Sequence, residues 1–116
     1  MKILLRFCEM APVCLLKIDS ESIPELIPAR YDLFPHDGGF AWGYEGSGVY
    51  SLAYAIISKL QIEIPDLDTA IDIKYASQLL VKRLLSTKNQ LFEHDLDAGA
   101  IAQFLMKNAK EDRLTS

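Results

Sequence analysis

A glycine-rich stretch directly before a predicted helix is the part of the sequence best suited to bind a ligand. The stretch 40–49 reads FAWGYEGSGV and holds the only tryptophan and three of the six glycines. The first N–H groups of a helix lack intrahelical acceptors, and the helix dipole is positive at that end. Gly46, Ser47 and Gly48 could therefore present N–H groups to a carboxylate, a phosphate or a nucleotide, with an aromatic side chain of the same stretch stacking on it.

Other features of this stretch oppose anion binding. Glu45 places a negative charge inside the loop, and no Lys-Ser or Lys-Thr pair follows the glycines as in a Walker-type phosphate loop. The order of the glycines also differs from the dinucleotide-binding fingerprint, and no βαβ unit surrounds them. The alternative is that the glycines only shape a tight turn, which the aromatic side chains fix to the core.

Aromatic side chains in and after this stretch indicate a protein-binding surface. Trp42 and Tyr44 lie in the loop, whereas Tyr50 and Tyr54 are spaced i, i+4 and lie off the apolar stripe of the helix that follows. Tyrosine and tryptophan are enriched at the energetic centres of protein interfaces. Together with the adjacent Glu45, these four are the predicted partner-binding residues. The alternative is that other elements of the fold cover them.

The sequence indicates neither a catalytic site nor a metal site. A hydrolase that uses His36 with Ser47 or Cys14 is conceivable, but there is no nucleophile-elbow motif and no positioned triad. His36 and His94 have no spacing typical of zinc ligands. We therefore predict no catalytic residue, no metal and no cofactor, and we expect a protein that is not an enzyme.

Composition and charge restrict the class of partner. The chain has 116 residues, of which 50% are hydrophobic and 24% charged, as in an ordinary globular domain. A formal net charge of −4 and a pI near 5.1 disfavour strong direct binding to nucleic acid, because the phosphates repel an acidic protein. An acidic surface instead suits a basic groove on another protein or on a nucleoprotein complex.

The cysteines and the N-terminal apolar residues bear on the cellular compartment. Cys8 and Cys14 belong to no zinc motif and require no disulfide, so two reduced thiols are expected. Arg6 and Glu9 interrupt the first apolar run, which is too short for a signal peptide or a membrane span. We expect a cytoplasmic protein, in a bacterial or an infected host cell, that makes no contact with a membrane.

The distribution of apolar residues predicts an α+β fold in a single domain over residues 1–116. A small antiparallel sheet from the N-terminal third, within a β part of about 1–46, is expected to pack against about three helices. The helical part covers about 47–109, and a frayed tail covers 110–116. Strands are predicted over 2–8 and 13–18 with Pro12 in the turn between them, and short extended pieces at 31–34, 62–64 and 91–92.

Three amphipathic helices are predicted from the apolar spacing. The first begins at Ser47, its predicted N-cap, or at Gly48, and it ends near Leu60. The second covers about 67–85, and the third begins after Asp95 or Asp97 and reaches about 108. The stripe of the first helix follows the full helical period and consists of Val49, Leu52, Ala53, Ile56, Ile57 and Leu60.

Motifs around the glycine loop resemble those of a family of small uncharacterised proteins from bacteria, plasmids and phages. That family carries a WGYGGSGP-type signature ahead of a Leu-Ala-Leu helix. The resemblance is strongest over 26–60 and looser over 75–105. It implies a small α+β domain from a bacterial or mobile-element setting, and it supplies no activity and no catalytic residues to transfer to this chain. Glu45 stands where the family usually has glycine, and Val49 where it usually has proline. The matching residues are Leu26-x-Pro28-x-Arg30-x-x-Leu33, His36-x-x-Gly39-Phe40-x-Trp42-Gly43-Tyr44-x-Gly46-Ser47-Gly48 and Leu52-Ala53.

These observations predict a non-enzymatic interaction protein, encoded by a phage or another mobile element, that binds and modulates a protein or nucleoprotein partner. One concrete version is an inhibitor of a host-defence complex, of the anti-CRISPR kind. The alternative is a regulatory domain that binds a small ligand, an anion or a nucleotide at Gly46, Ser47 and Gly48. A homodimer is compatible with either function.

Overall fold

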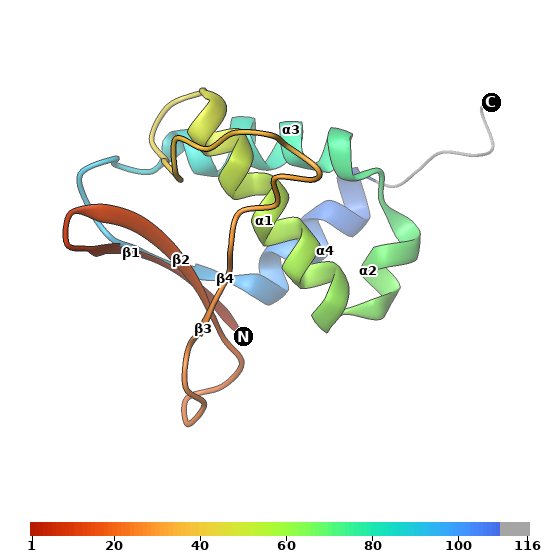
Figure 1. Cartoon of the computed structure of the whole chain (residues 1–116). Helices are drawn as coiled ribbons and strands as arrows, with labels where there is room; N and C mark the ends of the chain where they lie inside the picture. The colour runs from red at the N-terminus through yellow and green to blue at the C-terminus, as the bar shows by residue number, and fades with distance from the viewer. Residues whose placement is uncertain (110–116) are drawn as a thin grey trace.

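Over residues 1–109 the protein consists of four antiparallel strands and four α-helices, which confirms the expected α+β class. The structure is a computed structural model and describes residues 1–109, so the tail expected at 110–116 lies outside the described residues. Figure 1 shows the sheet on one side of the molecule and the helices gathered on the other. In chain order the elements are β1 (Lys2–Cys8), β2 (Ala11–Lys17), β3 (Glu25–Leu26), α1 (Ser47–Glu63), α2 (Pro65–Ala70), α3 (Ile73–Arg83), the 3₁₀ turn η1 (Leu85–Thr87), β4 (His94–Asp97) and α4 (Ala98–Asn108).

The sheet has the strand order β3-β2-β1-β4, so the first hairpin forms its centre. β1 and β2 pair along their whole lengths, and Ile3 of β1 also lies opposite Leu96 of β4. One strand of the sheet thus comes from the helical half of the chain. The extended piece expected at 91–92 is wrong, because these residues form a turn and the strand begins at His94.

The two faces of the sheet differ in character. Ile3 and Leu5 of β1 and Leu16 of β2 are fully buried on the face toward the helices, and Leu4, between Ile3 and Leu5, is 8% exposed. Side chains of the opposite parity, including Lys2 and Arg6, lie on the outer face. This alternation fixes the pairing register, because a shift by one residue would expose the buried set.

The turn between β1 and β2 consists of Glu9 and Met10, whose φ angles are 51° and 70°. Positive φ at both central residues is typical of the two-residue turn that suits the twist of a hairpin. Pro12 was expected in this turn, but it lies within β2 opposite Phe7. That expectation is wrong, because the buried register leaves only two residues for the turn.

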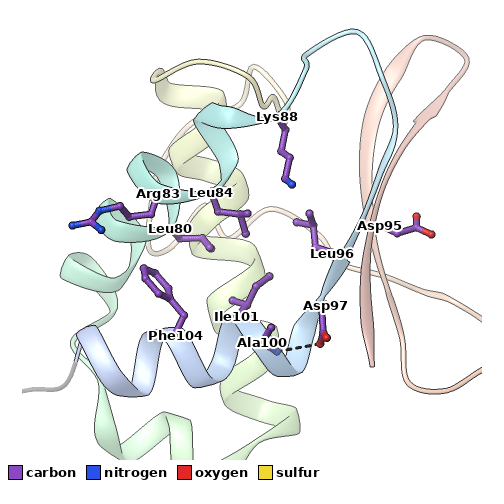
Figure 2. Close-up of a pocket in the computed structure, with 10 residues that line it drawn as sticks. All are labelled: Leu80, Arg83, Leu84, Lys88, Asp95, Leu96, Asp97, Ala100, Ile101 and Phe104. Carbon is purple, nitrogen blue, oxygen red and sulfur yellow. Dashed lines mark hydrogen bonds between the residues drawn. The ribbon is translucent and has the colours of Figure 1, made fainter.

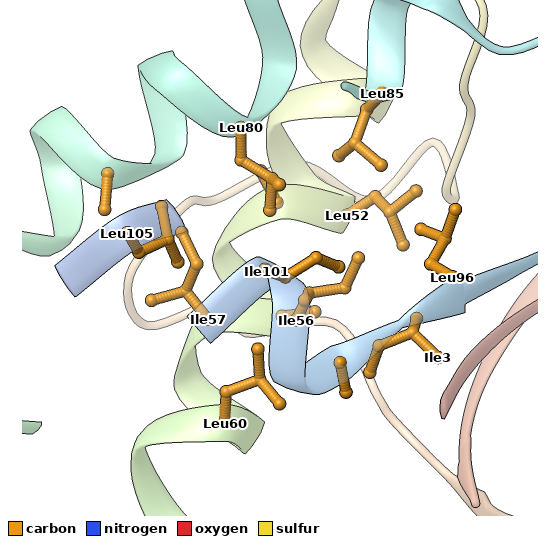
Figure 3. Close-up of a cluster of buried hydrophobic side chains, with 14 of the residues drawn as sticks. Ile3, Leu52, Ile56, Ile57, Leu60, Leu80, Leu85, Leu96, Ile101 and Leu105 are labelled. Carbon is orange, nitrogen blue, oxygen red and sulfur yellow. The ribbon is translucent and has the colours of Figure 1, made fainter. Parts of the chain in front are cut away.

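α1 runs through the middle of the molecule and supplies much of the core. Every residue of its predicted stripe is buried, which confirms the helical period read from the sequence. Figure 3 shows side chains of α1 meeting those of the other helices and of the sheet. The labelled members of this cluster are Ile3, Leu52, Ile56, Ile57, Leu60, Leu80, Leu85, Leu96, Ile101 and Leu105.

The second predicted helix is divided in two. Ile71 between α2 and α3 is extended (φ −124°, ψ 151°), and Asp72 caps α3 by accepting a hydrogen bond from the N–H of Lys74 at 3.1 Å. The N–H of Asp72 also donates to the carbonyl of Ala109 at 3.2 Å. A capping aspartate therefore starts a new helix where the apolar period alone predicted a continuous one over 67–85.

The first helix extends beyond its predicted end. It continues to Glu63, so the extended conformation expected at 62–64 is wrong for its first two residues. The helix ends at Glu63 because Pro65 disfavours helical conformation in Ile64, the residue that precedes it. Lys59 and Glu63 form an ion pair at 3.4 Å along the last turns.

A long connector leads from β3 to α1 and lies across the outer surface of α1 (Figure 1). The brief strand expected at 31–34 is wrong, because the N–H groups of Leu33 and Phe34 both donate to the carbonyl of Arg30, which forms a helical-type turn.

No helix within residues 1–109 has the length and apolar character needed to cross a membrane.

Candidate functional site

Trp42 fixes the glycine-rich loop to the rest of the protein. Its side chain is only 2% exposed, and its indole N–H donates to the carbonyl of Phe92 at 3.0 Å. The ring centroid lies 5.2 Å from that of Phe7 in β1 and 6.3 Å from that of His94 in β4. Trp42 therefore joins three segments of the chain. Although it was predicted to contact a partner, its burial places it underneath the surface and not on it.

Gly43 allows the loop to lie directly against the segment that follows α3. Its φ is +95°, and its N–H donates to the carbonyl of Leu85 at 2.9 Å. A Cβ at this position would lie 2.6 Å from the Cβ of Gln90 and 2.7 Å from the carbonyl oxygen of Lys88. Only glycine fits both the backbone conformation and the space, so Gly43 positions Tyr44 beside the loop 88–93.

These contacts gather four exposed apolar side chains at one end of the molecule, which we call the apolar end: Met10, Tyr44, Leu91 and Phe92. Their exposed fractions are 93%, 48%, 75% and 62%, in that order. In Figure 1 the β1–β2 turn and the loop before β4 lie side by side at this end. A hollow of about 290 Å³ lies between the three segments, lined by Phe7, Pro12, Ala41, Trp42, Tyr44, Gln90 and Leu91.

Charge at the apolar end has one sign. The three segments 7–12, 40–46 and 90–93 contain three glutamates and no lysine, arginine or histidine. Glu9 and Glu45 are exposed, and the carboxylate of Glu93 accepts a hydrogen bond from the N–H of Phe7 at 3.0 Å. The apolar end therefore has an acidic rim.

Met10 occupies a backbone conformation that methionine rarely adopts. With φ at 70°, it stands in the left-handed region, which favours glycine and asparagine and is unfavourable for other residues by roughly 1–2 kcal/mol. Its side chain nonetheless projects into solvent with almost no contacts. The two-residue turn requires this positive φ, and the side chain of Met10 adds no packing within the described residues.

Tyr50 and Tyr54 do not belong to this surface. The connector covers both, because the ring of Phe34 stacks on them with centroid distances of 6.3 and 5.4 Å. Burial, followed by the nearby Asp72 and Tyr50, raises the pKa of Tyr54. Of the five predicted partner-binding residues, the structure thus brings only Tyr44 and Glu45 to the exposed part of the apolar end.

The glycines of the predicted anion site pack closely against other residues of the loop. Gly46, and not Ser47, is the N-cap of α1, and no side chain caps this helix end. The prediction of Ser47 as the cap is therefore wrong. Gly48 is buried, and a Cβ there would lie 3.1 Å from both the Cβ of Ala41 and the carbonyl oxygen of Gly39. A role of these residues in ligand binding stays a prediction.

Among residues 1–109, no hydrogen bond joins His36 to Ser47 or to Cys14, the residues considered for nucleophilic catalysis. Cys14 lies in the core face of β2, and its burial raises the pKa of the thiol to about 12, so it remains protonated at neutral pH. His36 packs beside Phe34 in the connector, whereas a ring nitrogen of His94 lies 2.8 Å from the carbonyl oxygen of Asn89. Within residues 1–109, no three His, Cys, Asp or Glu side chains come together as a metal site requires.

Thiol reactivity tests the burial of Cys14. We expect a disulfide reagent at pH 8 to modify Cys8 rapidly and Cys14 only after unfolding, because the thiolate is the reactive form. Between the ordinary pKa of 9.0 and about 12, the folded state retains the Cys14 proton that the unfolded state loses. Stability should therefore fall as pH rises through this range. Equal rates for both thiols in the native protein would contradict this placement.

Three residues of the apolar end were not predicted from the sequence. Met10 could have been identified only if the second strand had been predicted from residue 11 and not from residue 13, because a two-residue turn would then have linked the two strands. Leu91 and Phe92 carried none, because an apolar pair in a loop is usually buried. Both side chains are exposed in the structure, and the indole of Trp42 holds the backbone of Phe92 by a hydrogen bond.

Comparison with known proteins identifies the family of the chain but assigns no function to it. Neither the curated proteins nor the solved structures include a significant match. The model of one family, described as a family of unknown function, matches residues 12–107. This range leaves out β1, but it covers nearly all of β2, the strands β3 and β4, the helices except for the last residue of α4, and two of the three segments of the apolar end. The chain therefore belongs to DUF6166, a family of unknown function.

Proposed function

We propose that this protein acts without catalysis, by binding another protein through the apolar end. The observation that carries the proposal is that Met10, Tyr44, Leu91 and Phe92, from three separate segments, are exposed at one end of the molecule, where Tyr44 and Leu91 line a hollow with an acidic rim. Exposed apolar side chains that are contiguous and rimmed by polar groups are typical of protein-binding surfaces. The hollow suits an apolar side chain of the partner inserted between them.

The acidic rim defines the chemistry of the partner. Glu9, Glu45 and Glu93 surround the apolar centre, so the complementary surface has an apolar projection flanked by lysine or arginine. Two copies of this chain joined through the same surface would bring like charges together. The charge pattern thus favours a different protein over a homodimer formed through this end.

The identity of the partner is a narrower hypothesis. Inhibition of a host-defence nucleoprotein complex, by a protein that a phage or another mobile element encodes, is compatible with an acidic binding surface, because such complexes have basic grooves. The resemblance of the glycine-loop motifs to phage and plasmid proteins supports this setting. Binding to free nucleic acid is not proposed, because the apolar end carries only negative charge.

Site-specific photocrosslinking in cells that encode the protein tests this function directly. We expect p-benzoylphenylalanine at position 91 to give one discrete crosslinked product. The matched control has the same photoreactive residue at position 23, because Ile23 is at least as exposed as Leu91 but lies in the loop between β2 and β3. The proposal fails if position 91 gives no product or the same products as position 23. A product of twice the mass of the chain would show self-association in place of a different partner.

Met10→Gly is expected to raise the stability of the protein and to weaken binding to its partner. Glycine relieves the positive φ at the turn, so the free energy of unfolding should rise by about 0.5–1 kcal/mol. Loss of the exposed thioether side chain should reduce capture of the crosslinked partner about tenfold. Urea denaturation and binding to the identified partner measure the two effects. A variant that is more stable and binds as well as wild type would exclude Met10 from the interface.

A further inference from the structure

A second hollow lies on another side of the molecule, between the end of α3, the strand β4 and the first turns of α4. Its volume is about 290 Å³, and it shares no lining residue with the hollow of the apolar end. Figure 2 shows side chains from these elements converging on it. Its apolar lining consists of Leu80, Leu84, Leu96, Ala100, Ile101 and Phe104, and charged residues stand at the rim.

One cationic group points into this apolar space. The side chain of Lys88 descends from the segment after η1 toward Leu84 and Leu96 (Figure 2), and it is half-buried. Within residues 1–109, Lys88 forms no ion pair with a carboxylate. An ammonium group over an apolar hollow is complementary to an anionic group attached to an apolar body.

The other charged residues at the rim are engaged elsewhere or turned away. Asp95 pairs with Arg6 at 2.5 Å on the outer side of the sheet, and Asp97 accepts the N–H of Ala100 at 3.1 Å as the cap of α4. The guanidinium of Arg83 points away from the hollow in Figure 2. Lys88 is therefore the group that determines the charge of a molecule bound there.

We propose that this hollow binds a free, small carboxylic acid with an aliphatic or aromatic body, whose carboxylate pairs with Lys88. The volume is at the lower limit for ligand pockets, which restricts the body to about eight carbon atoms. The apolar walls exclude water from the body, and the carboxylate remains at the open rim. This site is independent of the proposed protein-binding function, because the two surfaces have no lining residue in common.

Titration of the full chain with octanoate, followed by amide chemical shifts, tests the site. We expect saturable shifts at Leu84, Leu96 and Ile101, which line the hollow, and a dissociation constant between micromolar and millimolar. Octanamide has the same body without the charge, and it should bind about tenfold more weakly. Absence of shifts around the hollow, or equal affinity for octanamide, would overturn the proposal.

Two variants distinguish the contribution of the Lys88 charge to ligand binding from that of the shape of the hollow. Lys88→Met removes the charge but keeps an unbranched stem, and we expect octanoate affinity to fall about tenfold while octanamide affinity stays unchanged. The matched control is Lys82→Met, an exposed lysine of α3 outside the lining, which should bind as wild type does. Ala100→Leu fills the hollow from the surface of α4 and should weaken both ligands. Unaltered octanoate binding by Lys88→Met would overturn the role of Lys88, and hence the proposal.

Discussion

Gly43→Ala is expected to lower the free energy of unfolding by about 3 kcal/mol, from the unfavourable positive φ together with overpacking. The φ of +95° is adverse for any side chain, and the new methyl group would lie 2.6–2.8 Å from backbone and Cβ atoms of residues 88–90. Backbone atoms held by the hydrogen bond from the N–H of Gly43 to the carbonyl of Leu85 cannot move away easily. Urea denaturation monitored by the fluorescence of the single tryptophan measures the change.

Gly39→Ala is the matched control for this variant. Gly39 also has a positive φ, +88°, but no atom lies within 4 Å of the position of its missing Cβ. Only the conformational part of the penalty remains, so a loss of about 1 kcal/mol is expected. The difference between the two variants isolates the close approach of the loop to residues 88–90. Equal losses would mean that Gly43 is needed for its backbone angle alone.

Trp42→Ala is expected to destabilise the protein by about 4 kcal/mol, as for other large buried aromatic side chains. The variant removes the contacts with Phe7 and His94 and leaves the carbonyl of Phe92 without the indole N–H. For a domain with a total stability of roughly 5–15 kcal/mol, such a loss is a large fraction. Chemical denaturation followed by circular dichroism gives this value without depending on the missing tryptophan.

Tyr44→Ala provides the comparison from the same loop. Because its side chain is half exposed, its truncation should change stability by about 0.5 kcal/mol. Its effect is expected on partner binding, which should weaken about tenfold if Tyr44 is part of the interface. If Tyr44→Ala destabilised the protein as much as Trp42→Ala, the two aromatics would share a structural role. The division into a buried support and an exposed contact would then be wrong.

The helices could be predicted largely from local patterns. The stripe from Val49 to Leu60 repeats at the helical period, so the helix can be predicted without knowing which elements cover it. Asp97 caps α4 within the predicted range for the same reason, since a cap is a local interaction. Two local signals compete at Asp72. The apolar period predicted one continuous helix, whereas the side chain of Asp72 caps α3 and the chain forms two helices.

The candidate site was far less accessible to sequence reasoning. Trp42, Tyr50 and Tyr54 were expected at a surface because aromatic residues are frequent at interfaces, yet each is covered by a residue distant in the sequence. Phe34 covers the two tyrosines, and the loop that follows α3 covers the tryptophan. Composition and spacing describe what a residue prefers, but not which other segment will lie on it.

The sequence by itself determined the α+β class, the hairpin, the central helix and the acidic character of the protein, because these depend on local periodicity and on composition. Only the tertiary structure decided that β4 pairs with β1 and that three segments meet at the apolar end. Residues about ninety positions apart come together in this way: Ile3 lies opposite Leu96 in the sheet, and the N–H of Phe7 donates to the carboxylate of Glu93. Such contacts arise from the simultaneous burial of α1 by the sheet and the other helices, which no local pattern encodes.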